Sequence, residues 1–413
     1  MKIGFPVSIT VLLWSIAGFF RYIFEEKLSR APTLSKSQLS QKIKKVAICL
    51  PAHNEEVVIR ATIRSLKRLV STSQIYVVSD GSSDSTGHLV KLEKCNLLKI
   101  NTGVGKAKAL KTLIAHYKLL ETYEYILFVD ADMVLYADYL EKALPILEND
   151  KKIAAIAGYA VSSLRDHMIL SKNKFIVSYR YRLNRLLYNL LTYGQTWKLF
   201  NAAWVIPGSG SIYRTDVLEK LEIDTPRILI EDFNLAFQVH RKKLGRIAHY
   251  PAIGGIDQDP DNIRDYWQQV TRWNIGFFQT VRENGIWLSF FWLSLGFFTF
   301  EVLLNSIFIV LMPLIVLIFA AQFFLPYFYP QTSLASSFLS TFNITPLGIY
   351  LGVFVVDYIL TVFVAIRYNR YILAIYGLGF YFMHFLTSLI FLINLPKGLI
   401  LNSQGIWVPP TRR

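Results

Sequence analysis

The chain has 413 residues, of which 53% are hydrophobic, and it carries a formal net charge of +15. This length allows a substantial folded domain together with segments apolar enough to enter a membrane. The two cysteines, Cys49 and Cys95, support neither a disulfide framework nor a zinc cluster. The basic residues are dispersed and flank apolar segments, which favours lipid headgroups and phosphates over nucleic acid as partners.

The first apolar segment covers residues 3–20, and seven basic residues follow it before residue 46. This asymmetry predicts an uncleaved membrane anchor over residues 1–26, with the next domain in the cytosol. The alternative is a cleaved signal peptide. The segment lacks an evident small-residue cleavage site, and its basic residues follow it instead of preceding it.

Residues 45–262 alternate between short apolar runs of strand length and amphipathic stretches of helical spacing. The predicted strands cover residues 46–51, 75–80, 97–102, 125–130 and 153–160, and helices are predicted within 55–70 and 106–120. The alternation predicts an α/β fold with a mostly parallel sheet and helices on both faces. In such a fold ligands bind beyond the carboxyl ends of the strands.

The C-terminal third is more apolar. Residues 263–285 predict an interfacial helix, residues 286–395 a transmembrane region of three or four spans, and residues 396–413 form a basic tail. Single spans are expected at 346–366 and 371–395, whereas 286–325 fits either a hairpin of two spans or one span preceded by an interfacial helix. The ionisable residues of this region either line a pathway or make hydrogen bonds between helices: Glu301, Asp357 and His384.

Two aspartates one residue apart, Asp130 and Asp132, end the predicted strand at 125–130. Alternate side chains of an extended strand point to the same side, so the two carboxylates would need a positive partner. Hard oxygen ligands of this kind suit Mg²⁺ or Mn²⁺ completed by substrate phosphates. Acidic residues after strands also act as helix caps, which is the structural alternative.

Polar residues follow the neighbouring predicted strands as well. Glu55 comes after the first strand, Asp80 ends the second, and Lys106 follows a glycine-containing loop after the third. We expect them to converge on one cleft and to contact a nucleotide and its phosphates. Turn chemistry for the acids and simple solvation for the lysine are the alternatives.

Two further groups lie in predicted helices. Glu231 and Asp232 open a helix, where carboxylates either complement the helix dipole or provide a general base. Gln269, Arg272 and Trp273 stand at i, i+3 and i+4, hence on one helix face. They either hold a sugar and a phosphate or anchor the helix at a membrane interface.

Taken in order, these residues resemble the D, D-x-D, T-E-D and Q-x-x-R-W signature of the family 2 glycosyltransferases. The narrower resemblance is to the processive membrane synthases of cellulose, chitin, hyaluronan and poly-N-acetylglucosamine. It covers about residues 45–280 and implies a GT-A type fold. Two departures stand out: Ile230 replaces the threonine of T-E-D, and the tail at 407–413 differs in spacing from that of hyaluronan synthases.

The resemblance implies roles for individual residues. Asp232, next to Glu231, becomes the catalytic base, and Asp130 and Asp132 become the ligands of Mg²⁺ or Mn²⁺ on the donor diphosphate. The nucleotide-sugar site also takes in Glu55, Asp80, Lys106 and Arg272. The acceptor site is implied for Gln269, Trp273, and the loop that contains Gly208 and ends at Arg214.

The function implied is that of a multi-pass enzyme of the cell membrane with a cytosolic catalytic domain. It would transfer a sugar with inversion from a nucleotide sugar, a UDP-sugar above all, to a growing β-linked glycan and export the product. One alternative is a nonprocessive transferase that adds one sugar to a lipid acceptor. Another is a catalytically silent scaffold or export channel, against which the intact acids count. Oligomeric state and accessory subunits leave no signal in the sequence.

Overall fold

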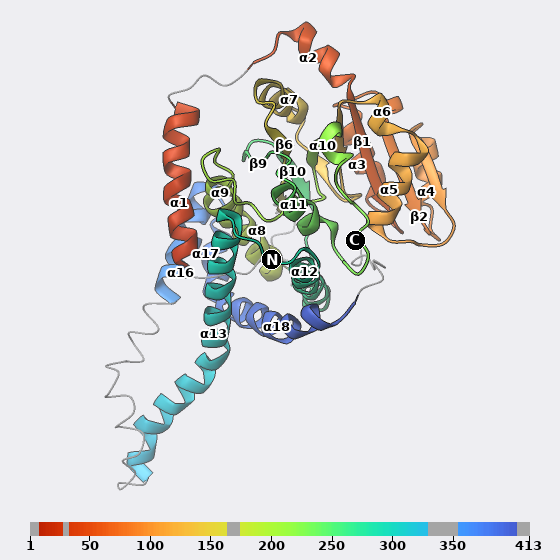
Figure 1. The fold of residues 1–413 in the computed structure, drawn as a ribbon. Coiled ribbons are helices and arrows are strands. Elements are labelled where there is room, and N and C mark those ends of the chain that lie inside the picture. Colours follow the sequence, from red (N-terminus) through yellow and green to blue (C-terminus); the bar gives the residue numbers. More distant parts are fainter. Residues whose placement is uncertain (1–7, 28–32, 163–173, 329–353, 403–413) are drawn as a thin grey trace.

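The computed structural model describes residues 8–27, 33–162, 174–328 and 354–402 (Figure 1). Parts of three predicted segments lie outside these residues: the anchor before residue 8, the 346–366 span before residue 354 and the tail after residue 402.

A seven-stranded sheet forms the centre of the domain, in the order β3-β2-β1-β4-β8-β6-β9. Strand β8 runs antiparallel to both of its neighbours, and the other pairs are parallel. The mostly parallel sheet expected from the sequence is therefore confirmed. Its strands are β1 Val46–Ala52, β2 Ile75–Asp80, β3 Asn96–Ile100, β4 Tyr125–Phe128, β6 Ile153–Ile156, β8 Ser211–Arg214 and β9 Arg246–Ala248.

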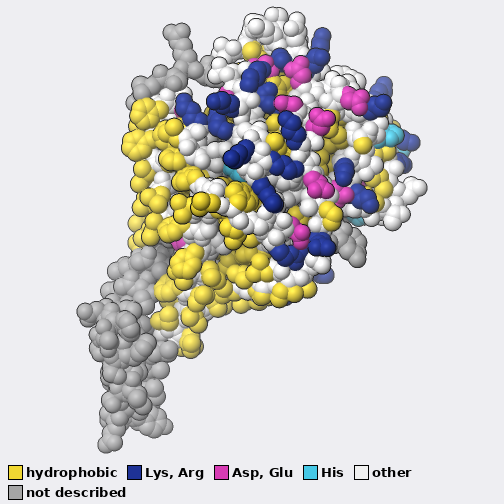
Figure 2. All heavy atoms as spheres, viewed as in Figure 1, with side chains coloured by type: hydrophobic (Ala, Val, Ile, Leu, Met, Phe, Trp, Pro, Cys, Tyr) yellow, Lys and Arg dark blue, Asp and Glu magenta, His cyan; other side chains and the backbone are white. Residues whose placement is uncertain are grey.

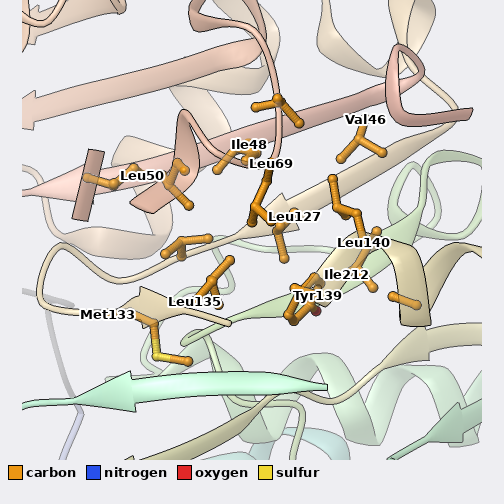
Figure 3. Packing of buried hydrophobic residues seen from close by; sticks show 14 of the residues in the cluster. Val46, Ile48, Leu50, Leu69, Leu127, Met133, Leu135, Tyr139, Leu140 and Ile212 are labelled. Carbon is orange, nitrogen blue, oxygen red and sulfur yellow. The ribbon is translucent and has the colours of Figure 1, made fainter. Parts of the chain in front are cut away.

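The residues that point to either face of this sheet are apolar, and helices therefore cover both faces. Ile48 and Leu50 face a core closed by α3 (Ile59–Leu66), α4 (Thr86–Leu92) and α7 (Tyr139–Asn149) (Figure 3). Ala47 and Cys49 face the opposite core, closed by α5 (Lys106–His116), α10 (Thr215–Leu218) and α11 (Glu231–Arg241). Two short helices, α2 (Lys36–Ile43) and α6 (Leu119–Thr122), complete the domain.

The single strand predicted over residues 153–160 is wrong: the chain forms β6 and then β7 (Tyr159–Ser162), in different sheets. Strand β7 belongs to a three-stranded sheet with β5 (Val134–Leu135) and β10 (Gly254–Asp257). The bend falls at Gly158, where a Cβ atom would lie only 2.2 Å from the carbonyl oxygen of Gly210. Glycine permits this close approach, which hydropathy alone does not reveal.

Helix α8 (Lys174–Leu186) leads from the small sheet toward the apolar helices and continues through a π-helical stretch, Leu187–Thr192, into α9 (Tyr193–Gln195). Its arginines point into the protein. Arg182 pairs with Asp357, and the guanidinium of Arg185 lies 4.1 Å from the ring centre of Tyr368. The helix is thereby tied to α16 (Val356–Arg367) and to the residue that follows it.

The apolar helices lie along one side of the domain (Figure 1). They are α1 (Ile9–Arg21) with its π-helical extension Tyr22–Lys27, α13 (Phe290–Phe328), α16, α17 (Ile372–Gly377) and α18 (Phe380–Ile400). Within the described residues, two helices are long and apolar enough to cross a membrane: Phe290–Leu317 and Phe380–Ile400. The helix expected over residues 263–285 is present as α12 (Ile263–Asn284). Because α13 is one continuous helix, the hairpin alternative for residues 286–325 is wrong.

The ionisable residues of the apolar segments make hydrogen bonds between helices. Glu301 accepts hydrogen bonds from the Ser8 hydroxyl at 2.7 Å and the Thr10 backbone N–H at 3.1 Å, and so caps the start of α1. His384 Nε2 lies 3.2 Å from Asp357, which also pairs with Arg182. The structural alternative for these residues is therefore confirmed.

The outer faces of these helices are exposed and apolar. Figure 2 shows a continuous band of hydrophobic side chains along one flank and the lower side, whereas charged side chains gather over the sheet domain. The band includes Ile9, Leu12 and Ile16 of α1 and Leu293, Phe297 and Phe300 of α13. Soluble monomers rarely expose so large an apolar surface, so this face is suited to contact with lipid.

Candidate active site

A cavity of about 650 Å³ lies beyond the carboxyl ends of β1, β2 and β4 and is closed by α11 and α12. This is the position expected for a ligand site in an open α/β sheet. Of the residues predicted to form the site, all but Gly208 and Arg214 line this cavity: Glu55, Asp80, Lys106, Asp130, Asp132, Glu231, Asp232, Gln269, Arg272 and Trp273.

Asp130 and Asp132 belong to a turn that begins two residues after β4 ends. The turn is fixed by the Thr62 hydroxyl, which donates to the Ala131 carbonyl at 2.6 Å, and by the Met133 N–H, which donates to the Asp130 carbonyl at 3.1 Å. The two carboxylates therefore reach the same cavity from a turn, whereas the sequence pattern had placed them on an extended strand.

Two carboxylates facing a cavity fit Mg²⁺ or Mn²⁺ if a ligand supplies the remaining oxygens. Within the described residues, no cluster of three or more His, Cys, Asp or Glu side chains is arranged to hold a metal alone. Asp130 and Asp132 would therefore supply only part of the ligands of such an ion, and oxygens of a bound phosphate group could supply the rest.

Lys106 links the two acidic groups of the cavity. Its Nζ lies 2.9 Å from Asp130 Oδ1 and 2.9 Å from Glu231 Oε1. Burial disfavours the charged ammonium, but the carboxylates of Asp130, Glu231 and Asp232 outweigh this effect and hold the pKa of Lys106 well above its usual value. Lys106 is thus a fixed positive charge between the D-x-D turn and helix α11.

The carboxylate of Asp80 holds the loop that carries this lysine. Its two oxygens accept the backbone N–H groups of Val104 at 2.8 Å and Gly105 at 2.9 Å, and Lys106 follows as the first residue of α5. Gly105 has φ of +93°, a conformation that favours glycine. Asp80 therefore lines the cavity as predicted and also sets the position of Lys106. Glu55 lines the same side but is fully buried.

Glu231 and Asp232 occupy the first turn of α11, where the helix dipole favours negative charge. Burial nevertheless raises the pKa of Asp232 to about 7, with Lys106 opposing the rise and Glu231 and Asp130 adding to it. A carboxyl group with this pKa can exchange a proton near neutral pH. Asp232 therefore has the protonation behaviour of a general base.

Gly208 does not line the cavity, but it lies next to Lys106 and Asp232. A Cβ atom there would come within 2.4 Å of Lys106 Nζ and 2.9 Å of Asp232 Oδ1, and the backbone N–H of Gly208 donates to Asp232. A glycine is thus required for Lys106 and Asp232 to approach each other. Its position here is structural, next to the proposed base.

Arg214 lies elsewhere, and the expectation that it contributes to the acceptor site is wrong. It pairs with Tyr125 at the beginning of β4, the end opposite to Asp130. There its Nε donates to the Ile153 carbonyl at 2.8 Å, and its Nη2 donates to the carbonyls of Leu147 and Asp150. Arg214 therefore fastens the end of α7 to the sheet. Because β8 is antiparallel to β4, the loop before it reaches the cavity and its last residue does not.

Helix α12 brings Gln269, Arg272 and Trp273 to the cavity from one face, as their spacing predicted. Gln269 Oε1 is buried and accepts no hydrogen bond within the described residues. An orphaned buried oxygen facing a cavity is a place where a ligand donor fits.

The sequence did not single out Arg180 of α8 or Asp259, which follows β10, yet both line the cavity. Both are buried, and they form an ion pair of 2.9 Å. The sequence did contain one signal, the Tyr-Arg-Tyr-Arg run at residues 179–182. Arginines among aromatic residues of a helix that becomes buried need partners, so this run could have indicated a buried ion pair.

Residues 47–221 match the family described as Glycosyl transferase family 2. The chain carries a family 2 glycosyltransferase domain. The matched residues include most of β1, all of β2 and β4, and the D-x-D turn, whereas the chain extends further, through α11, α12 and the apolar helices.

Two curated relatives cover more of the enzyme. It is 28% identical over 334 residues, 72% of this chain and 75% of the relative, to "Probable glycosyltransferase YdaM" of Bacillus subtilis. It is 23% identical to "Poly-beta-1,6-N-acetyl-D-glucosamine synthase" of Staphylococcus epidermidis, over 99% of this chain and 97% of that protein. The similarity to the synthase thus includes the apolar helices as well as the family 2 domain.

Among solved structures, the enzyme is similar to "Mannosyltransferase PcManGT from Pyrobaculum calidifontis in complex with GDP-Man and Mn2+". The TM-score is 0.52 at 16% identity, and the match covers 94% of this chain and 95% of the mannosyltransferase. This likeness concerns the fold. The GT-A type α/β fold expected from the sequence is confirmed.

We predict that Lys106→Met lowers the melting temperature more at pH 8 than at pH 5.5. Without the lysine, Asp130, Glu231 and Asp232 lose their counter-charge, so their pKa values rise and acid relieves their repulsion by protonation. Thermal unfolding in detergent at the two pH values measures the difference. The matched control is Lys108→Met, an exposed lysine of the same helix. An equal loss at both pH values would contradict the role of Lys106 as counter-charge.

Proposed function

We propose that the enzyme elongates a β-linked glycan from a nucleotide sugar, with UDP-N-acetylglucosamine as donor and poly-β-1,6-N-acetylglucosamine as product. One observation carries the proposal: a partly buried carboxyl group of pKa about 7, Asp232, lies in the same cavity as the D-x-D pair and the Q-x-x-R-W face. The similarity over nearly the whole chain to a synthase of that polymer supports the choice of sugar.

In the proposed reaction, Asp232 accepts the proton of an acceptor hydroxyl as that oxygen attacks the anomeric carbon of the donor. The new C–O bond forms while the bond from the anomeric carbon to the diphosphate oxygen breaks. The nucleoside diphosphate leaves with that electron pair, so the sugar is transferred with inversion. Lys106 opposes the repulsion between Glu231 and Asp232. Lys106 and Arg272 compensate the charge that develops on the leaving group.

Asp130 and Asp132 would hold Mg²⁺ or Mn²⁺, which supplies positive charge to the donor diphosphate. Asp80 and Glu55 line the nucleotide side of the cavity. Arg272 reaches it from α12, next to Gln269 and Trp273, which we assign to the acceptor. The divalent metal therefore belongs to the donor half of the site.

We further propose that the apolar helices lie in the cell membrane, so that the enzyme is multi-pass with its catalytic domain in the cytosol. The seven basic residues between 21 and 45 favour this orientation. The domain boundaries proposed are an anchor at 1–26, a catalytic domain at 45–262, an interfacial helix at 263–285, a membrane region at 286–395 and a tail at 396–413. Its partners are then the bilayer and the growing glycan, and in this proposal the glycan is exported across the membrane as it is synthesised.

The proposal is tested by incubating the purified full chain in detergent with radiolabelled UDP-N-acetylglucosamine and Mg²⁺ or Mn²⁺. We expect metal-dependent release of UDP and a polymeric product, both abolished by a chelator and restored by excess metal. A single added sugar would identify the nonprocessive alternative, a transferase for a lipid acceptor. Activity unchanged by the chelator would contradict the metal site, and no release of UDP would contradict the proposed donor.

We predict that Asp232→Asn lowers kcat by about 10²–10⁴-fold, because a positioned base contributes roughly that factor. Affinity for UDP, measured by equilibrium binding, should change little, since the amide keeps the shape of the side chain. The control is Asp138→Asn, a partly exposed aspartate that pairs with Lys142 outside the cavity. Persistent turnover in Asp232→Asn would remove Asp232 from the role of base.

We also predict that kcat/KM for the donor rises with pH through about 7. The raised pKa of Asp232 means that acid protonates the base in the free enzyme, so kcat/KM at pH 6 should be about tenfold below its plateau. Lys106→Met should move this rise in kcat/KM to higher pH, because the lysine lowers the pKa of Asp232. A profile flat between pH 5.5 and 8, or a rise moved to lower pH by this substitution, would contradict the assignment.

A further inference from the structure

One buried cation of the cavity has no part in the reaction described above. Arg180 of α8 is only 1% exposed, yet its side chain lines the cavity together with Asp259, Gln269 and Trp273. These residues come from three separate elements: α8, the segment after β10, and α12. They make up the part of the cavity that we assign to the acceptor.

Three contacts hold the guanidinium of Arg180 in one orientation. Its Nε and Nη2 donate to Asp259 Oδ1 at 3.1 and 2.9 Å, and the guanidinium carbon lies 4.6 Å from the ring centre of Trp273. Asp259 is fixed in turn by the Ser162 hydroxyl and by Asn184 Nδ2, at 3.4 Å for the latter. A planar guanidinium paired on one edge and stacked on an indole keeps its remaining edge in a defined direction.

That remaining edge carries an unmet hydrogen-bond donor. Arg180 Nη1 is buried and has no hydrogen-bond partner within the described residues. Leaving such a group unpaired is unfavourable, and more so if it is charged. Gln269 Oε1 is an orphaned acceptor in the wall of the same cavity. A sugar hydroxyl both donates and accepts, so a carbohydrate can satisfy a donor and an acceptor of this kind.

We propose that Arg180 is an acceptor-binding residue, whose Nη1 donates to a hydroxyl or ring oxygen of the acceptor sugar beside Trp273, with Asp259 as its positioning residue. The charge of Arg180 is already matched by Asp259, so the ligand it fits is a neutral sugar and not a second phosphate. The inference rests on the proposed function, because it assigns this wall of the cavity to the acceptor.

The test compares Arg180→Met, Arg180→Lys and wild type as full chains in detergent, in two arms. The first arm measures transfer from UDP-N-acetylglucosamine to a β-1,6-linked N-acetylglucosamine tetrasaccharide, together with UDP release without acceptor. The second measures equilibrium binding of the tetrasaccharide to the protein, independently of turnover. UDP affinity confirms that each variant is folded.

For Arg180→Met we expect the KM and the dissociation constant for the tetrasaccharide to rise about tenfold or more, as for a lost hydrogen bond to a charged group. The loss of transfer to the tetrasaccharide should exceed any change in UDP release without acceptor. Arg180→Lys should be intermediate, since it keeps the charge but not the planar fork. The matched control is Arg185→Met on the same helix, which packs against Tyr368 and Tyr181 outside the cavity and should leave acceptor affinity unchanged.

The two proposals fail in different ways. No release of UDP by wild type would overturn the proposed donor chemistry, whereas the binding arm still decides the role of Arg180. Tetrasaccharide affinity unchanged in Arg180→Met would overturn the inference. It would also be overturned if wild type bound no tetrasaccharide, or if Arg180→Met lost UDP release and transfer equally, because the arginine would then be purely structural.

Discussion

Three carboxylates of the cavity surround Lys106, those of Asp130, Glu231 and Asp232, and their mutual repulsion is the constraint that the rest of the site satisfies. Lys106 reduces it by lying within hydrogen-bond distance of Asp130 and Glu231. The lysine can do so because Asp80 fixes the loop before it and Gly208 leaves room behind it. The compensation is incomplete, since the pKa of Asp232 still rises to about 7. The remaining repulsion suits Asp232 to the role of base that we propose and would favour an added cation.

The sequence allowed the sheet domain to be predicted because its signals are local. Apolar runs mark strands that are buried on both faces, and polar residues that follow parallel strands must meet at one edge. Asp80 and the D-x-D pair were found in this way, and the spacing of Gln269, Arg272 and Trp273 placed them on one helix face. The roles of Asp232 and its neighbours came from the family resemblance and not from the pattern alone.

Other features depend on contacts between distant segments, which spacing does not reveal. The split of residues 153–160 into β6 and β7 follows from the backbone of Gly210 passing Gly158. Arg214 was misplaced because the direction of β8 decides which end of the strand faces the cavity. Arg180 was missed because the sequence gives no reason to pair it with Asp259, 79 residues away. Glu301 became a helix cap through a contact with Ser8 at the other end of the chain.

The contact between α12 and α18 connects the cavity to the apolar helices of the enzyme. Phe278 packs against Phe391, and Gly398 lets the two helices approach so closely that a Cβ atom there would lie 2.7 Å from Phe278. The helix that presents Gln269 and Trp273 is therefore half-covered by a helix of the C-terminal region. Removing the apolar helices to obtain a water-soluble fragment would expose this face of α12 and leave the cavity wall that it forms without support, so the sheet domain and the apolar helices are best handled as one piece.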